Sequence, residues 1–150
     1  MQEIEYKFLV DHSKWKQLDI GKPQRIVQGF ITNTVDKVVR VRIKGKKGIL
    51  TIKGKSEGIT RTEFEYEIPL KDAEQLLDQF TDKYIEKDRY EIIHEGKKWE
   101  VDVFKGPLTG LILAELEVDS TEETFSIPEW VTKDVSTDPS YFNAILINQC

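Results

Sequence analysis

Apolar and polar residues alternate over most of this chain, in short runs that are separated by turn-forming residues such as Gly45, Gly96 and Gly106. Eight runs show the two-residue period that puts successive side chains on opposite faces of a β-strand. They are EIEYKFLV at residues 3–10, GFIT at 29–32, VVRVRI at 38–43, ILTIKG at 49–54, RTEFEYEI at 61–68, DRYEIIH at 88–94, KKWEVDVF at 97–104 and ILAELEVD at 112–119. The short turns between them predict antiparallel pairing.

Helical signals are fewer than strand signals. Asp11 or Ser13 can cap a first short helix, and Pro69 precedes the segment LKDAEQLLDQF, whose apolar residues recur at helical spacing. A third helix is predicted from about Ser140 to the end of the sequence. Because strands dominate, the pattern predicts a mainly β (α+β) fold with a few flanking helices.

The polar faces of the predicted strands carry ionised residues almost exclusively, and most strands carry a pair of like charges two positions apart. Two carboxylates at that separation, about 7 Å, repel by about 2 kcal/mol at an effective dielectric constant near 20. The acid pairs are Glu3 and Glu5, Glu63 and Glu65, Glu100 and Asp102, and Glu115 and Glu117; the base pairs are Arg40 and Arg42, and Lys87 and Arg89; Lys7 and Lys53 add further cations.

Two arrangements account for this alternation. One is an antiparallel sheet with a solvated face and a buried face, which is common. The other is a barrel in which the charged faces line a lumen and the apolar faces point outward, where the helices and Trp15, Phe80 and Trp130 cover part of them. Segregation of the charges favours the barrel, because acid clusters suit a divalent cation and base clusters suit a polyanion.

Composition narrows the functional classes. A chain of 150 residues is the size of one domain, which we place at residues 1–150, and its 33% charged residues exceed the usual share of about 25%. The net charge of −5 argues against nonspecific binding of nucleic acid. Cys150 has no partner for a disulfide, and no signal peptide or membrane-spanning apolar run is present. We therefore expect a cytoplasmic monomer or homodimer with no membrane or nucleic-acid partner.

Several catalytic arrangements are missing. No G-x-x-x-x-G-K-[ST] loop exists, which excludes the usual P-loop site. His12 and His94 lie beside a predicted helix start and a turn, and we interpret both as surface residues. Cys150 has no histidine near it in the sequence, so it is not expected to be a nucleophile.

The N-terminal segment EIEYK matches the E-x-E-x-K signature of the CYTH domains, the triphosphate tunnel metalloenzymes. The order of the later motifs also resembles this family over nearly the whole chain: VRVR, TIKGK, RTEFEYEI, EKDRY, WEVDVF and LAELEVD. The resemblance implies a closed eight-stranded antiparallel β-barrel tunnel with a charged interior, acting on a small-molecule triphosphate with Mg²⁺ or Mn²⁺.

Three positions depart from the family pattern. Tyr6 stands where many relatives have arginine, at a position expected to point outward. Ser140 and Phe142 occupy places that are often basic or polar in relatives. These two changes argue against phosphate binding by the terminal helix.

The resemblance and the shared strand faces together give each charged group an expected role. The triphosphate-binding cations are Lys7, Arg40, Arg42, Lys53, Lys87 and Arg89, since arginine forms bidentate phosphate contacts and lysine acts as a point charge. The expected metal ligands are Glu3, Glu5, Asp102, Glu115 and Glu117, because Mg²⁺ and Mn²⁺ prefer hard oxygen ligands. Candidates for activating the attacking water are Lys53, Lys87, Glu63 and Glu65.

These roles predict a metal-dependent triphosphatase, with inorganic tripolyphosphate as the leading substrate. The enzymatic alternatives are a class IV adenylate cyclase and a nucleoside or thiamine triphosphatase; no adenine-binding signature favours the cyclase. A polyphosphate-binding module is the non-enzymatic alternative. It needs the cations but not the acid pairs, so the presence of those pairs argues against it.

Overall fold

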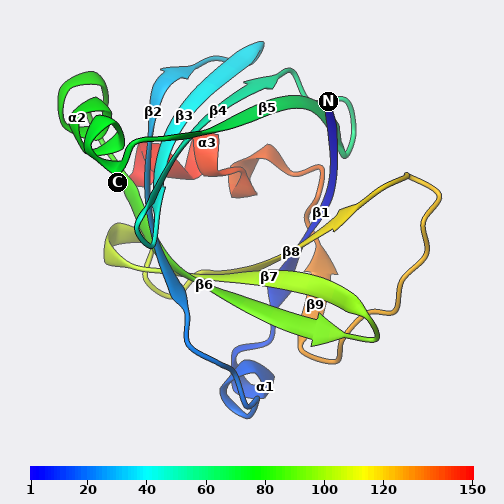
Figure 1. Cartoon of the computed structure of the whole chain (residues 1–150). Helices are drawn as coiled ribbons and strands as arrows, with labels where there is room; N and C mark the ends of the chain where they lie inside the picture. Colours follow the sequence, from blue (N-terminus) through cyan, green and yellow to red (C-terminus); the bar gives the residue numbers. More distant parts are fainter.

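The computed structural model describes residues 1–150, and its nine strands form one antiparallel sheet that closes on itself (Figure 1). In space the order is β5-β4-β3-β2-β6-β7-β8-β1, and β1 pairs back with β5. The predicted closed eight-stranded barrel is therefore confirmed, with β9 as an additional strand. The strands are β1 (Gln2–Val10), β2 (Gln24–Asn33), β3 (Lys37–Lys44), β4 (Lys47–Gly54), β5 (Thr60–Ile68), β6 (Ile85–His94), β7 (Lys97–Phe104), β8 (Ile112–Val118) and β9 (Val131–Asp134).

The barrel closes at a short seam on β1. Residues Gln2 to Ile4 pair with β5, in a register that sets Glu3 opposite Arg61. Farther along β1, Phe8 and Val10 pair with β9 instead. The sequence pattern does not predict β9, because this strand is only four residues long and shows no alternation; three of its residues are exposed.

The pairing register carries the charged faces into the barrel. Directly paired residues share a face of the sheet, and Lys7 lies opposite Glu115, Glu115 opposite Glu100, and Asp102 opposite Arg89. The side chains of Lys7, Arg89, Asp102 and Glu115 are all buried. The structure is therefore a barrel with a charged interior, and not a sheet with one solvated face.

At one end the inward faces change from charged to apolar. Leu9 pairs with Leu113, and Lys87 pairs with Phe104. Leu9, Phe104 and Leu113 form an apolar cluster with Leu146 and Ile147 from the C-terminal segment. Figure 1 shows this segment crossing the space that the strands surround. The C-terminal segment therefore packs inside the barrel.

The C-terminal segment is not the single helix predicted from Ser140 onward; that prediction is wrong. It consists of a 3₁₀ turn η2 (Pro139–Tyr141), a short helix α3 (Asn143–Leu146) and a second 3₁₀ turn η3 (Ile147–Gln149). Phe142 has extended backbone angles, φ −72° and ψ 137°, which interrupt the helix between η2 and α3.

The other helices match the sequence pattern. In α1 (His12–Lys16), the Asp11 carboxylate accepts a hydrogen bond from the Lys14 amide at 3.0 Å, so Asp11 rather than Ser13 is the cap. The helix α2 (Leu70–Phe80) follows Pro69 as predicted, and a 3₁₀ turn η1 (Gly106–Leu108) lies between β7 and β8. None of the helices is long and apolar enough to span a membrane.

The apolar outer faces of β1, β7 and β8 form a second core on the outside of the barrel. Trp15 of α1 packs on Trp130, and Trp130 packs on Trp99, whose side chain is fully buried; the ring centroids of each of these two pairs lie 5.9 Å apart. The predicted cover by Trp15 and Trp130 is confirmed. Phe80 is 58% exposed and covers little, because it ends α2 and extended backbone follows at Thr81.

The helix α2 packs on the barrel at Gly48. A Cβ atom at Gly48 would lie 2.7 Å from the Ala73 Cβ and 2.9 Å from the Ile68 carbonyl oxygen, both too close for real contacts. Ala73 is fully buried there. The absence of a side chain at Gly48 therefore lets α2 lie directly against β4.

We expect Gly48→Ala to lower the free energy of unfolding by about 1–3 kcal/mol, since overpacking pushes α2 from the strand. Chemical denaturation measures this difference. Gly21→Ala is the matched control, because a Cβ at Gly21 meets no atom within 4 Å. Equal stability of the two variants would contradict the proposed packing.

Candidate functional site

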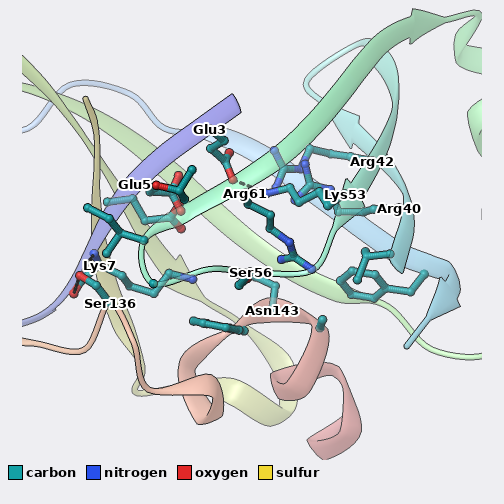
Figure 2. Close-up of a pocket in the computed structure, with 18 residues that line it drawn as sticks. Glu3, Glu5, Lys7, Arg40, Arg42, Lys53, Ser56, Arg61, Ser136 and Asn143 are labelled. Carbon is teal, nitrogen blue, oxygen red and sulfur yellow. Dashed lines mark hydrogen bonds and ion pairs between the residues drawn. The ribbon is translucent and has the colours of Figure 1, made fainter. Parts of the chain in front are cut away.

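One pocket inside the barrel is lined by charged residues from five strands (Figure 2). About 730 Å³ of empty space lies among its lining residues, a volume that includes open solvent at the mouth of the pocket. Its charged residues are Glu3, Glu5 and Lys7 of β1, Arg40 and Arg42 of β3, Lys53 of β4, Arg61 of β5 and Glu115 of β8. Five cations face three carboxylates, an excess of two positive charges, in a chain whose net charge is −5. The pocket lining thus carries a local excess of positive charge.

Besides Arg61, the pocket cations Lys7 and Arg42 form no ion pair with a carboxylate. Lys7 Nζ donates to the Tyr141 carbonyl at 3.2 Å and lies 5.6 Å from the centroid of the Phe142 ring. Arg42 Nε donates to Gln28 Oε1 at 2.8 Å. Both side chains are held by neutral partners, so their charges remain available to an anion.

Arg40 and Arg42 are buried side by side on one face of β3. Burial lowers the pKa of Arg42 to about 9, and repulsion from Arg40 and Arg89 adds to this effect. Arg40 donates from its terminal nitrogen to Thr51 Oγ1 at 3.2 Å, but its buried Nε has no partner. An unpartnered donor beside two crowded positive charges indicates that an anion completes this part of the site.

Lys53 is engaged by two carboxylates. Its Nζ lies 2.9 Å from Glu3 Oε1 and 3.2 Å from Glu63 Oε2. Burial raises the pKa of Glu63, and the neighbouring Glu3 adds to that shift while Lys53 opposes it. Lys53 thus lies between two acids at the wall of the pocket, and Glu63 lies behind it.

Next to the pocket is a buried cluster of ion pairs, formed by Lys87, Arg89 and Asp102. Asp102 Oδ1 accepts from Arg89 Nε at 2.7 Å, and Oδ2 accepts from Arg89 at 2.8 Å and lies 2.7 Å from Lys87 Nζ. Burial alone would raise the pKa of Asp102, but Arg89 and Lys87 outweigh it and lower the pKa to about 2. Both oxygens of Asp102 are therefore already occupied by cations.

A hydrogen-bonded chain connects this cluster to the pocket. Lys87 Nζ and Gln28 Nε2 both donate to Asn143 Oδ1, at 2.9 and 2.8 Å, and Gln28 Oε1 accepts from Arg42. Asn143 belongs to α3, so the C-terminal segment positions cations of both groups. Phe142, Asn143 and Ala144 also line the pocket.

The carboxylates of Glu5 and Glu115 lie close enough for each to shift the pKa of the other. Burial, followed by the charge of Glu115, raises the pKa of Glu5 well above its ordinary value. Burial would also raise the pKa of Glu115, but Lys7, Arg89 and Lys87 together hold it well below the ordinary value. One proton or one divalent cation would relieve the repulsion between the two carboxylates.

Whether the site suits a metal ion depends on the number of carboxylates that can reach one point. No three acidic or histidine side chains are arranged around one point in the structure. Mg²⁺ is usually held by one or two carboxylates, with water and substrate phosphate completing the octahedron. The donor set of Glu5 and Glu115 therefore fits Mg²⁺ or Mn²⁺ that binds together with a phosphate substrate.

The remaining predicted site residues lie outside the pocket lining. Glu65 is exposed and approaches Arg40 at 3.9 Å. Glu117 is exposed overall, but its carboxylate is partly removed from water, which raises its pKa, and the charges of Glu3 and Glu100 add to the shift. The structure thus brings seven predicted residues to the pocket: Glu3, Glu5, Lys7, Arg40, Arg42, Lys53 and Glu115.

Arg61, Ser136 and Asn143 also line the pocket, and our sequence reading assigned none of them. The sequence does indicate that Arg61 faces the barrel interior, because it shares its strand face with Glu63 and Glu65. Ser136, whose hydroxyl accepts a hydrogen bond from the Lys7 amide at 2.9 Å, and Asn143 come from segments without strand periodicity. Their placement depends on the tertiary structure.

The comparisons agree with one another over nearly the whole chain. The sequence profile of the CYTH domain matches residues 1–142. An inorganic triphosphatase of Acetivibrio thermocellus is 44% identical over 147 residues, which cover 97% of this chain and 93% of that protein. An inorganic triphosphatase of Nitrosomonas europaea is 34% identical over 150 residues, which cover 97% of each chain.

Solved structures give the same result. The crystal structure of the inorganic triphosphatase NE1496 has a TM-score of 0.66 and 30% identity, and the match covers 97% of this chain and 93% of that one. The profile match and the identities to both relatives agree with the charged barrel found in the structure. They show that this chain belongs to the CYTH domain family.

Proposed function

We propose that this chain is a metal-dependent hydrolase of triphosphates and that inorganic tripolyphosphate is its preferred substrate. The observation that carries the proposal is the group of buried cations in the pocket, where Lys7 and Arg42 have no carboxylate partner and Arg40 Nε has no partner at all. Two relatives that share at least 34% of their residues with this chain are named inorganic triphosphatases, which supports the same activity.

In this proposal, Arg40, Arg42 and Lys7 bind the phosphate oxygens, and Lys53 contributes a fourth cation from β4. These donors are fixed before the substrate enters, because Thr51, Gln28 and the Tyr141 carbonyl already hold them. Preorganised cations stabilise the charge that develops on the phosphoryl oxygens during transfer to water.

Glu5 and Glu115 are the proposed metal-binding carboxylates, with Glu3 beside them on β1. A bound Mg²⁺ or Mn²⁺ would neutralise phosphate charge and orient the transferring phosphoryl group. Glu115 is kept ionised by Lys7 and Arg89, so one carboxylate is ready to bind a cation without losing a proton. Glu117 is the proposed outer member of this acidic set.

Asp102, Lys87 and Arg89 are proposed as a positioning cluster, because Asp102 is fully buried and both of its oxygens accept from cations. Of the two lysines considered for activating the attacking water, we propose Lys53, since it lines the pocket while Lys87 does not. Glu63 holds Lys53 in place at 3.2 Å, and the exposed Glu65 has a supporting electrostatic role.

A site that binds its substrate through charges alone should prefer the substrate with the highest charge density and should not discriminate between nucleosides. We expect kcat/KM for tripolyphosphate to exceed that for ATP by at least about tenfold, which is about 1.4 kcal/mol of transition-state binding. ATP, GTP and CTP should give similar values. The measurement incubates the protein with each substrate and Mg²⁺ or Mn²⁺ and separates orthophosphate, pyrophosphate and cyclic AMP. A strong preference for ATP with cyclic AMP as product would instead show a cyclase.

We expect Glu5→Gln to reduce turnover of tripolyphosphate by more than about 100-fold, because a metal-binding oxygen is lost. The same change should raise the melting temperature of the metal-free protein near pH 7.5 by about 2–4 °C. The fold raises the pKa of Glu5, so the stability that Glu5 contributes is present below its unfolded pKa and is lost as the pH rises through the higher native value.

Calorimetry in the presence of EDTA, at pH 7.5 and at pH 4, measures this stability difference. At pH 4 the wild-type Glu5 is protonated and resembles glutamine, so the difference between the two proteins should shrink. Glu74→Gln on the exposed surface of α2 is the control and should change neither activity nor stability. Near wild-type turnover of Glu5→Gln at saturating metal would refute the assignment of Glu5.

A further inference from the structure

Arg61 reaches the same pocket from the start of β5. It lies directly opposite Glu3 across the barrel seam and shares its strand face with Glu63. Figure 2 shows its side chain extending into the space between Glu3 and Asn143. Arg61 is half-buried, so its guanidinium group is partly removed from bulk water.

The carboxylates near Arg61 are already engaged. Glu3 and Glu63, whose charges act on Arg61 most strongly among the acids, are both paired with Lys53. Arg61 forms no ion pair with either of them. Its one hydrogen bond runs from Nε to the Gly54 carbonyl oxygen at 2.6 Å.

This single bond orients the group. With Nε fixed on Gly54, the two terminal nitrogens of the guanidinium have no protein acceptor, while the charge of Arg40 repels the group. Arginine stays charged under these conditions and binds phosphate through two parallel N–H donors. An unpaired, oriented guanidinium at a positively charged pocket is suited to a phosphoryl oxygen pair.

We infer that Arg61 is a further substrate-binding residue, which contacts a phosphoryl group of the polyphosphate through its two terminal nitrogens. Without Arg61 the excess of cations over carboxylates in the pocket falls from two to one. Arg61 thus supplies half of the net positive charge that the pocket offers to a polyanion. This inference rests on the proposed function, because it assigns a residue to the same site.

The test compares Arg61→Met, which keeps the aliphatic length and removes the charge, with Lys55→Ala. Lys55 is exposed, lies one residue from the Gly54 anchor and does not line the pocket, so it controls for loss of a nearby positive charge. Calorimetry measures the affinity for inorganic tripolyphosphate in EDTA, and steady-state kinetics with Mg²⁺ measure KM and kcat separately.

We expect Arg61→Met to weaken tripolyphosphate binding and to raise KM by at least about tenfold, the effect of losing a charge-assisted pair of hydrogen bonds. Because the contact exists before and during the reaction, kcat should change much less than KM. The melting temperature without ligand should stay within about 3 °C of wild type. Lys55→Ala should change affinity by less than about twofold.

An affinity and KM for Arg61→Met within about twofold of wild type would overturn the inference. So would a lower melting temperature with an unchanged KM, which is the result expected if Arg61 only ties β5 to Gly54. Where the methionine variant does not fold, Arg61→Gln keeps a donor for the Gly54 carbonyl and is judged by the same criteria. A wild-type protein that binds tripolyphosphate but hydrolyses no triphosphate would refute the proposed function, while calorimetry would still decide the role of Arg61.

Discussion

The buried carboxylate of Asp102 fixes the positions of the cations on which the site depends. It holds Arg89 with both oxygens and Lys87 with one, and Lys87 continues through Asn143 and Gln28 to Arg42 at the pocket. Loss of one partner from such a buried group typically costs about 3–5 kcal/mol, because the other charges remain buried and unpaired. The barrel therefore combines neutralised charges, which set the geometry, with unpaired charges, which face the ligand.

Because charged side chains fill much of the barrel interior, the hydrophobic stabilisation of the fold comes from two separate apolar clusters. One apolar cluster lies outside the barrel, where Trp15, Trp99 and Trp130 pack on β1, β7 and β8. The other lies where the inward faces turn apolar and meet Leu146 and Ile147. These two clusters supply the burial that a small domain normally obtains from its interior. The lumen is thereby freed for polar groups.

The alternation predicted the barrel and most of the pocket, because strand parity alone puts Glu5, Arg40 and Glu115 on inward faces. Parity does not show which charge is already paired. Asp102 and Lys87 follow the same pattern as Glu5 and Arg42, yet they bind each other. The break at Phe142 and the strand β9 were missed because neither has a periodic signal. Arg61 had the right parity as the first residue of the run at 61–68, but parity does not show that its terminal nitrogens lack an acceptor.

The pairing of β1 with β8 and β9 has a consequence for the order in which the chain folds. Lys7 meets Glu115 and Ser136, more than one hundred residues later in the sequence, and its ammonium group rests on the Tyr141 carbonyl. Contacts of such long sequence separation make folding slow, since the chain loses entropy before they form. During synthesis, β2 to β5 can pair while β1 still lacks its partners β8 and β9. Because Ser136 and Asn143 line the pocket, its lining cannot be complete before this part of the chain has been synthesised.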